Sequence, residues 1–200
     1  MFARTERLLL RPGFPEDAAA VAAAIGEEAV VRNLAMAPWP YSERDAADWL
    51  AMEQHPLLPS FVMVKRTGGT PRVIGAIGIH MIDHDDGSRG PEIGYWIARP
   101  YWGLGFATEA GRAVLDIART NGLPPLTAGH FIDNPASGTV LRKLGFRPTG
   151  RIVPRYSRAR GTHVPCALFE QGEEDAMAEV PAGKRPWNED QRETIRLMAA

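Results

Sequence analysis

The sequence has little cysteine, little lysine and no long apolar run. Cys166 is the single cysteine in 200 residues, which excludes an intramolecular disulfide and a cysteine-based zinc site. The five histidines lack the paired spacing of a metal site, so we expect no metal. The longest apolar stretch, around residues 18–25, is too short to span a bilayer, and the leucines 8–10 are too few for a signal-peptide core. These absences predict a reduced, cytoplasmic protein without a membrane partner.

The charge balance excludes another class of partner. The net charge is −1, which gives no overall attraction to nucleic acid. Hydrophobic residues make up 44% of the chain, enough for the core of one ordinary domain. We expect that domain over residues 4–171 and a C-terminal extension over 172–200, with a short capped helix at 188–199. Arginines gather near the end of the domain, and we interpret them as a solvated basic hairpin, with an acidic partner as the alternative. They are Arg147, Arg151, Arg155, Arg158 and Arg160.

The first half of the chain predicts antiparallel strands. Residues 16–26 are strong helix formers, and Ser42 is placed to cap a second helix after a proline-containing loop. A hairpin-like "TGGTP" joins two of the strand-like segments. Strands are expected over 7–12, 60–66, 72–82 and 91–98.

The second half changes to a β-α-β pattern. Residues 105–120 place apolar side chains at helical spacing, and 125–132 form a strand, so 91–132 predicts parallel strands with a right-handed crossover. Asn134 caps a further helix, whose expected apolar face is Ala136, Val140, Leu141 and Leu144. A final hairpin over 149–156 and 162–171 follows. The fold class is therefore α/β (α+β), a mixed, mostly antiparallel sheet with a central β-α-β unit.

The segment "YWGLGFATEA", residues 101–110, places Gly103, Gly105 and Ala107 between a strand and a helix. Backbone amides that converge at a helix N-terminus bind anions such as a diphosphate. The alternative is a tight connection whose glycines only relieve strain. The turn alone does not decide between the two.

Three phosphate-binding patterns compete for this turn. A Walker A loop needs a Gly-Lys-Ser/Thr sequence, which is absent here. A dinucleotide fingerprint needs a glycine where Thr108 stands, and Asp133 at the end of the next strand comes late for the ribose. That interpretation remains only as a minor one, because the preceding strands are expected to be antiparallel. The third pattern is Gln/Arg-x-x-Gly-x-Gly/Ala, which aligns with residues 102–107.

This third pattern is the acetyl-CoA signature of the GCN5-related N-acetyltransferases. The chain resembles that superfamily, and in particular the branch that includes the ribosomal-protein alanine acetyltransferases. "TERLLLRP", "EIGYWI" and "NPASGTVLRKLGF" resemble the branch in the expected order, so the resemblance covers roughly residues 4–170. Trp102 departs from the signature, which has a polar residue there.

The resemblance implies an acetyl-CoA site between two splayed parallel strands. Main-chain groups near Ile97 and Ala98 would hold the thioester, and the amides of residues 104–108 would bind the diphosphate. The cofactor-binding residues expected in this way are Ile97, Ala98, Trp102, Gly103, Leu104, Gly105, Phe106, Ala107, Thr108 and Asn134.

Two residues are candidates for acid–base catalysis. Glu92 stands at the start of the strand and could accept the proton of the amine, directly or through water; a solvated carboxylate at a strand end is the equal alternative. Many family members have a tyrosine acid seven residues beyond the asparagine, where this chain has Leu141. Ser137 matches a serine of the branch and could help to protonate the thiolate, although a small polar residue in a first helical turn needs no such role.

The acceptor is the least defined part of the sequence. Trp39 and Tyr41 in the loop, and His80 in the sheet, are the candidates for contact with it, although each could serve packing alone. The predicted reaction is acetyl transfer from acetyl-CoA to a primary amine, at a protein N-terminus or on a small molecule. A non-catalytic acyl-CoA-binding module is the alternative, and the oligomeric state, a homodimer or otherwise, is open.

Overall fold

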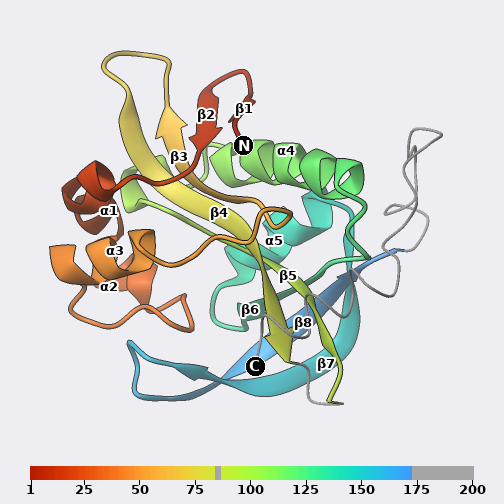
Figure 1. Ribbon diagram of the computed structural model, residues 1–200. Coiled ribbons are helices and arrows are strands. Elements are labelled where there is room, and N and C mark those ends of the chain that lie inside the picture. Colours follow the sequence, from red (N-terminus) through yellow and green to blue (C-terminus); the bar gives the residue numbers. More distant parts are fainter. Residues whose placement is uncertain (84–86, 173–200) are drawn as a thin grey trace.

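The computed structural model describes residues 1–83 and 87–172, and their centre is a mixed eight-stranded sheet with helices on both faces (Figure 1). The strand order is β1-β2-β3-β4-β5-β6-β8-β7. The C-terminal helix predicted at 188–199 lies outside the described residues.

Among the described helices, none has the length and apolar character needed to cross a membrane.

The pairings among the first five strands, from β1 to β5, are all antiparallel, as the sequence predicts. A short strand at the N-terminus precedes the four expected ones, and the hairpin around "TGGTP" joins β3 to β4. Their bounds are β1 Ala3–Arg4, β2 Leu8–Arg11, β3 Ser60–Lys65, β4 Arg72–Asp83 and β5 Arg89–Ile97.

The β-α-β unit follows in the predicted place. Helix α4 (Phe106–Thr120) leads from β5 to β6 (Thr127–Phe131), and β5 and β6 are parallel. Only Glu92 and Thr127 pair across them, although β5 is nine residues long. The final hairpin adds β7 (Phe146–Ser157) and β8 (Thr162–Gln171), and β8 lies between β6 and β7. The mixed, mostly antiparallel fold class is confirmed.

Alternation along the strands separates two apolar layers. Phe61 on β3 belongs to the main core, which α4 and α5 (Pro135–Lys143) cover, whereas Val62 faces α1 (Ala18–Ile25) and α3 (Glu43–Leu50). A 3-10 turn, η1 (Pro15–Asp17), precedes α1, and a second, η2 (Arg99–Tyr101), follows β5. Figure 1 shows α1, α2 and α3 gathered on one side of the sheet.

Of the two helix N-caps predicted from the sequence, one is confirmed and one is not. Ser42 caps α3 as predicted: its hydroxyl accepts from the Asp45 amide at 3.2 Å, and the Asp45 carboxylate accepts from the Ser42 amide. Asn134 occupies the N-cap position of α5, but its side chain makes no capping hydrogen bond. The prediction of Asn134 as a side-chain cap is therefore wrong.

Two local details differ from the sequence expectations. Helix α2 (Glu28–Val31) was not predicted, because four residues are too few to show a period; its Val30 and Val31 are buried. On α5, Ala136 is exposed and Gly138 is buried instead. A Cβ atom on Gly138 would lie 2.6 Å from His130 Nε2, so the glycine permits the close approach of α5 to β6.

Candidate active site

The two glycines before α4 adopt backbone conformations that other residues avoid. Gly103 has φ +73° and Gly105 has φ +81°, in the left-handed region that favours glycine. A Cβ atom on Gly103 would meet nothing within 4 Å, and one on Gly105 would meet only Arg7 Nη2 at 3.6 Å. The glycines therefore satisfy the backbone, and the space beside them is open to a ligand.

The helix that follows presents its first amides without a cap. Gly105 is the N-cap of α4 and has no side chain to accept from them. The amides of Phe106, Ala107 and Thr108 lack intrahelical acceptors, and the helix dipole adds partial positive charge there. The side chains of Phe106 and Thr108 are buried, so these two residues can offer a ligand only main-chain groups. Such a helix start suits a diphosphate.

A cleft of about 1600 Å³ extends from this turn through the gap between β5 and β6. It is lined from both faces of the sheet, by Gly105 and Ala107 at the turn, by Ser137 on α5, and by Glu92 and His80 on the other face. The gap exists because the parallel pairing stops at Glu92 and Thr127.

Ile97 and Ala98, the two residues expected to hold the thioester, differ in the direction of their main-chain groups. Ala98 donates its amide to the Ile74 carbonyl at 2.8 Å, and its own carbonyl accepts from the Tyr101 amide at 2.9 Å. Both groups of Ala98 are thus used within the protein. Strand alternation directs the amide and carbonyl of Ile97 the opposite way, toward the cleft.

Trp102, the departure from the family signature, has a structural role in this turn. Its indole Nε1 donates to the Ile97 carbonyl at 2.6 Å, while 44% of the residue's surface is exposed. A carbonyl left without a strand partner by the splay is thereby satisfied. The Ile97 amide remains as a main-chain donor directed toward the cleft.

Glu92 is buried rather than solvated. Only 5% of its surface is exposed, and its two carboxylate oxygens accept from Arg155 Nη1 at 2.7 Å and Nη2 at 2.9 Å. His80 Nε2 lies 3.8 Å from the same carboxylate. The alternative of a solvated strand-end carboxylate is wrong. The solvated basic hairpin holds only in part, because Arg155 and Arg160 form ion pairs, whereas the other three arginines of the set are exposed.

The acceptor candidates divide into two groups. His80 and Tyr41 line the cleft, whereas Trp39 lies outside its lining. Burial lowers the pKa of His80 more than the neighbouring Glu92 charge raises it, which favours the neutral imidazole. Burial, followed by the charge of Asp45, raises the pKa of Tyr41 to about 12.

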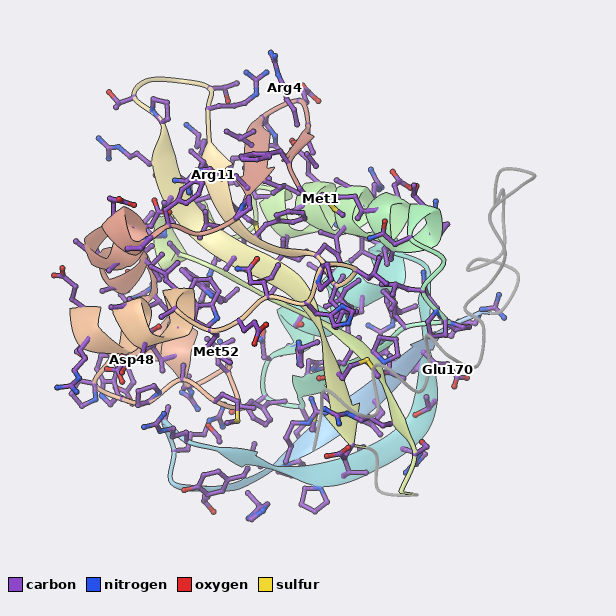
Figure 2. The ribbon with its side chains drawn as sticks, in the orientation of Figure 1. Met1, Arg4, Arg11, Asp48, Met52 and Glu170 are labelled. Atoms are coloured by element: carbon purple, nitrogen blue, oxygen red, sulfur yellow. The ribbon has the colours of Figure 1, made fainter. Side chains whose placement is uncertain are left out.

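The α3 side of the cleft also has lining residues that no motif indicated. Asp48 and Met52 are among its lining residues, and both lie at the α3 side of the molecule in Figure 2. They come from the end of α3 and the loop after it, where nothing in the sequence distinguishes them from an ordinary exposed helix face.

On the opposite face of β5, Tyr95 contacts Ser137. The Tyr95 hydroxyl lies 2.9 Å from Ser137 Oγ and donates to the Ser137 carbonyl at 3.2 Å. Burial raises the pKa of Tyr95 to about 12, so its phenol stays protonated. Sequence reasoning missed Tyr95; its place two residues before Ile97, on the same face, is the signal that could have found it. Leu141 is 1% exposed and packs in the core.

Asn134 and Asp133 have separate surroundings at the end of β6. Asn134 lines the cleft, and its side chain is not used to cap α5. Asp133 accepts from Arg160 at 2.7 Å and from Arg32 at 3.2 Å, and the hydrogen bond from Arg160 lowers its pKa. An Asp133 engaged in this way argues against the ribose contact that a dinucleotide site requires.

Comparison with known proteins identifies the family. The acetyltransferase (GNAT) domain matches residues 7–147. This chain belongs to the GNAT acetyltransferases. It is 30% identical over 171 residues to the uncharacterised N-acetyltransferase p20 of Bacillus licheniformis, covering 82% of this chain and 92% of that relative.

Solved structures show the same GNAT fold. Ribosomal-protein-S5-alanine acetyltransferase from Vibrio fischeri has a TM-score of 0.70 at 19% identity, covering 88% of this chain and 98% of that one. Microcin C7 self-immunity acetyltransferase, solved with acetyl-CoA and AMP, has a TM-score of 0.67 at 16% identity, covering 83% and 92%. The family uses acetyl-CoA as co-substrate, so this GNAT protein is an acetyl-CoA-dependent acetyltransferase. Its uncapped amides and open glycine turn fit the diphosphate of that co-substrate.

Replacing Gly105 with valine should abolish acetyl-CoA binding while the fold persists. A β-branched residue in the left-handed region costs at least about 1–2 kcal/mol, and relief of that strain would move the amides that follow. Calorimetric titration with acetyl-CoA measures the effect. Gly150→Val is the matched control, because Gly150 on β7 has φ +78° and nothing within 4 Å of its Cβ position but lies outside the cleft lining. Unchanged affinity in Gly105→Val would contradict the site.

Proposed function

We propose that this GNAT protein transfers the acetyl group of acetyl-CoA to a primary amine by direct attack on the thioester. The amine belongs to a protein N-terminus or to a small molecule. The observation that supports this most is the course of the cleft, which joins the amide-rich turn at α4 to the buried Glu92 through the gap between β5 and β6. A co-substrate seated on the turn can extend its thioester into that gap.

The alternation of β5 supports a division between cofactor and acceptor sides. Tyr95 lies on the face that α4 and α5 cover, and Ser137 of α5 contacts it there. Glu92 is three residues before Tyr95 on β5, so its side chain is on the opposite face. This is the face of Trp96 and the α1–α3 layer. The amine then approaches from the α1–α3 side, and the thiol leaves on the α5 side.

The residues around the gap can accept and donate the protons that this reaction transfers. As the amine nitrogen bonds to the acetyl carbon and the C–S bond breaks, Glu92 accepts the amine proton, directly or through water, with the neutral His80 ring beside it. The Ile97 amide is directed to donate to the developing oxyanion. The Ser137 hydroxyl, oriented by Tyr95, helps to protonate the leaving thiolate.

One observation favours a second candidate function, an acyl-CoA-binding module without catalysis. The usual tyrosine acid is replaced by Leu141, which is buried among core side chains and has no proton to give. The Tyr95–Ser137 contact favours the catalytic function over this one, because it provides hydroxyl groups on the same side of the sheet.

Thiol release from acetyl-CoA, measured against a panel of peptides with free N-termini and small primary amines, tests the proposal. We expect turnover with at least one class of amine and a mass increase of the acceptor by one acetyl group. Measurable acetyl-CoA binding without turnover on any amine would favour the binding module.

Glu92→Gln should slow acetylation of a peptide α-amine most at low pH. Below the α-amine pKa of about 7.7–8.0, the acceptor is an ammonium that needs a base, and a general base contributes about a hundredfold or more. Above that pH the amine is already unprotonated and depends less on a base, so the difference in rate between Glu92→Gln and the unchanged protein should become smaller. The pH–rate profile of kcat/KM measures this.

His80→Asn is the control for this experiment, because it removes the neighbouring ring and retains the Glu92 carboxylate. A low-pH deficit that follows His80→Asn instead would assign the proton to His80. If Glu92→Gln lowered kcat/KM by the same factor at every pH, Glu92 would not be the base, and its role would be limited to the ion pair with Arg155.

A further inference from the structure

The segment Thr5–Arg7, which precedes β2, is joined to the first turn of α4. One carboxylate oxygen of Glu109 accepts from Thr5 Oγ1 at 2.5 Å and from the Arg7 amide at 2.8 Å. The other accepts from Arg7 Nε at 2.7 Å. Figure 1 shows β1 and β2 beside the start of α4. About one hundred residues of sequence separate the two segments, so "TERLLLRP" and "YWGLGFATEA" meet only in the fold.

The same guanidinium also contacts the glycine turn. Arg7 Nη1 donates to the Leu104 carbonyl at 3.0 Å, and the Arg7 guanidinium carbon lies 4.2 Å from the centre of the Phe106 ring. Leu104 stands between the two left-handed glycines. The peptide unit is planar and trans, so a Leu104 carbonyl held toward Arg7 directs the Gly105 N–H to the opposite side.

The charge of Arg7 is balanced by its partner. Burial raises the pKa of Glu109, but hydrogen bonds from Thr5 and Arg7 outweigh it, and the pKa lies below its ordinary value. Glu109 is therefore ionised at neutral pH, and the pair has no net charge. Arg7 contributes geometry to the turn rather than an additional positive charge for a ligand.

We propose that Arg7 is a positioning residue for acetyl-CoA: it fixes the Leu104 peptide so that the amides of the turn are oriented for the diphosphate before the ligand arrives. This inference rests on the placement of the diphosphate at the glycine turn. It gives the segment "TERLLLRP" a part in co-substrate binding, which the sequence did not indicate.

Arg7→Lys is the decisive variant, because lysine retains the charge but loses the planar fork that reaches Glu109, Leu104 and the Phe106 face together. The loss of a hydrogen bond from a charged group weakens binding about tenfold or more, so we expect the Kd for acetyl-CoA to rise by about that factor. Glu109→Gln, which keeps an acceptor oxygen but no charge, should give a smaller rise.

The control is Arg11→Lys, at the other end of the neighbouring strand β2. Arg11 binds Asp17 through Nη1 at 2.6 Å and Nη2 at 2.7 Å and lies 5.1 Å from the Phe14 ring centre, so it reproduces the local environment of Arg7 away from the turn. Thermal melts of both variants would report the loss of stability, and only Arg7→Lys should weaken acetyl-CoA binding.

Two acetyl donors, acetyl-CoA and S-acetylpantetheine, distinguish a loss of diphosphate positioning from a general loss of active-site structure, because S-acetylpantetheine lacks the diphosphate. Arg7→Lys should raise the KM for acetyl-CoA with little change in kcat, and leave kcat/KM for S-acetylpantetheine unchanged. An unaltered Kd for acetyl-CoA, an equal effect of Arg11→Lys, or an equal loss with S-acetylpantetheine would overturn the inference.

If Gly105→Val also left the Kd unchanged, the placement of the diphosphate itself would be wrong. The Kd measurements need no acceptor, so failure to find one does not affect them.

Discussion

The early separation of β5 from β6 is the constraint on which the rest of the site depends. Parallel strands joined by a crossover helix normally continue their ladder, but these two pair only at Glu92 and Thr127. Beyond that point the main-chain groups on one edge of β5 need other partners. Trp102 satisfies one of them at Ile97, and the cleft occupies the rest of the gap.

Charged side chains stabilise the two sides of that gap by a similar arrangement. Glu92 on one side is held by the fork of Arg155, and Glu109 near the turn is held by Arg7 and Thr5. A buried carboxylate without such partners would be costly. The pairs therefore permit acidic groups close to the proposed diphosphate site and to the proposed position of the amine without leaving either charge uncompensated.

Local signals in the sequence were sufficient for the fold and for the turn. The periodicity of residues 105–120, the glycines before them and the antiparallel strands upstream predicted the β-α-β unit and the place of the glycine turn. The contacts of Glu92 with Arg155, of Arg7 with Glu109 and of Tyr95 with Ser137 were not predictable, because each joins residues that lie far apart in the sequence. Asn134 failed as a predicted cap for the opposite reason: a local signal was present, but the side chain lines the cleft instead.

A crystal structure of the protein with acetyl-CoA tests the central claim most directly. We expect diphosphate oxygens within hydrogen-bonding distance of the amides of residues 105–108, and the thioester between β5 and β6 near the Ile97 amide. A diphosphate bound elsewhere, for example beside Lys65 and Arg72 on the β3–β4 hairpin, with the gap between β5 and β6 closed, would contradict it.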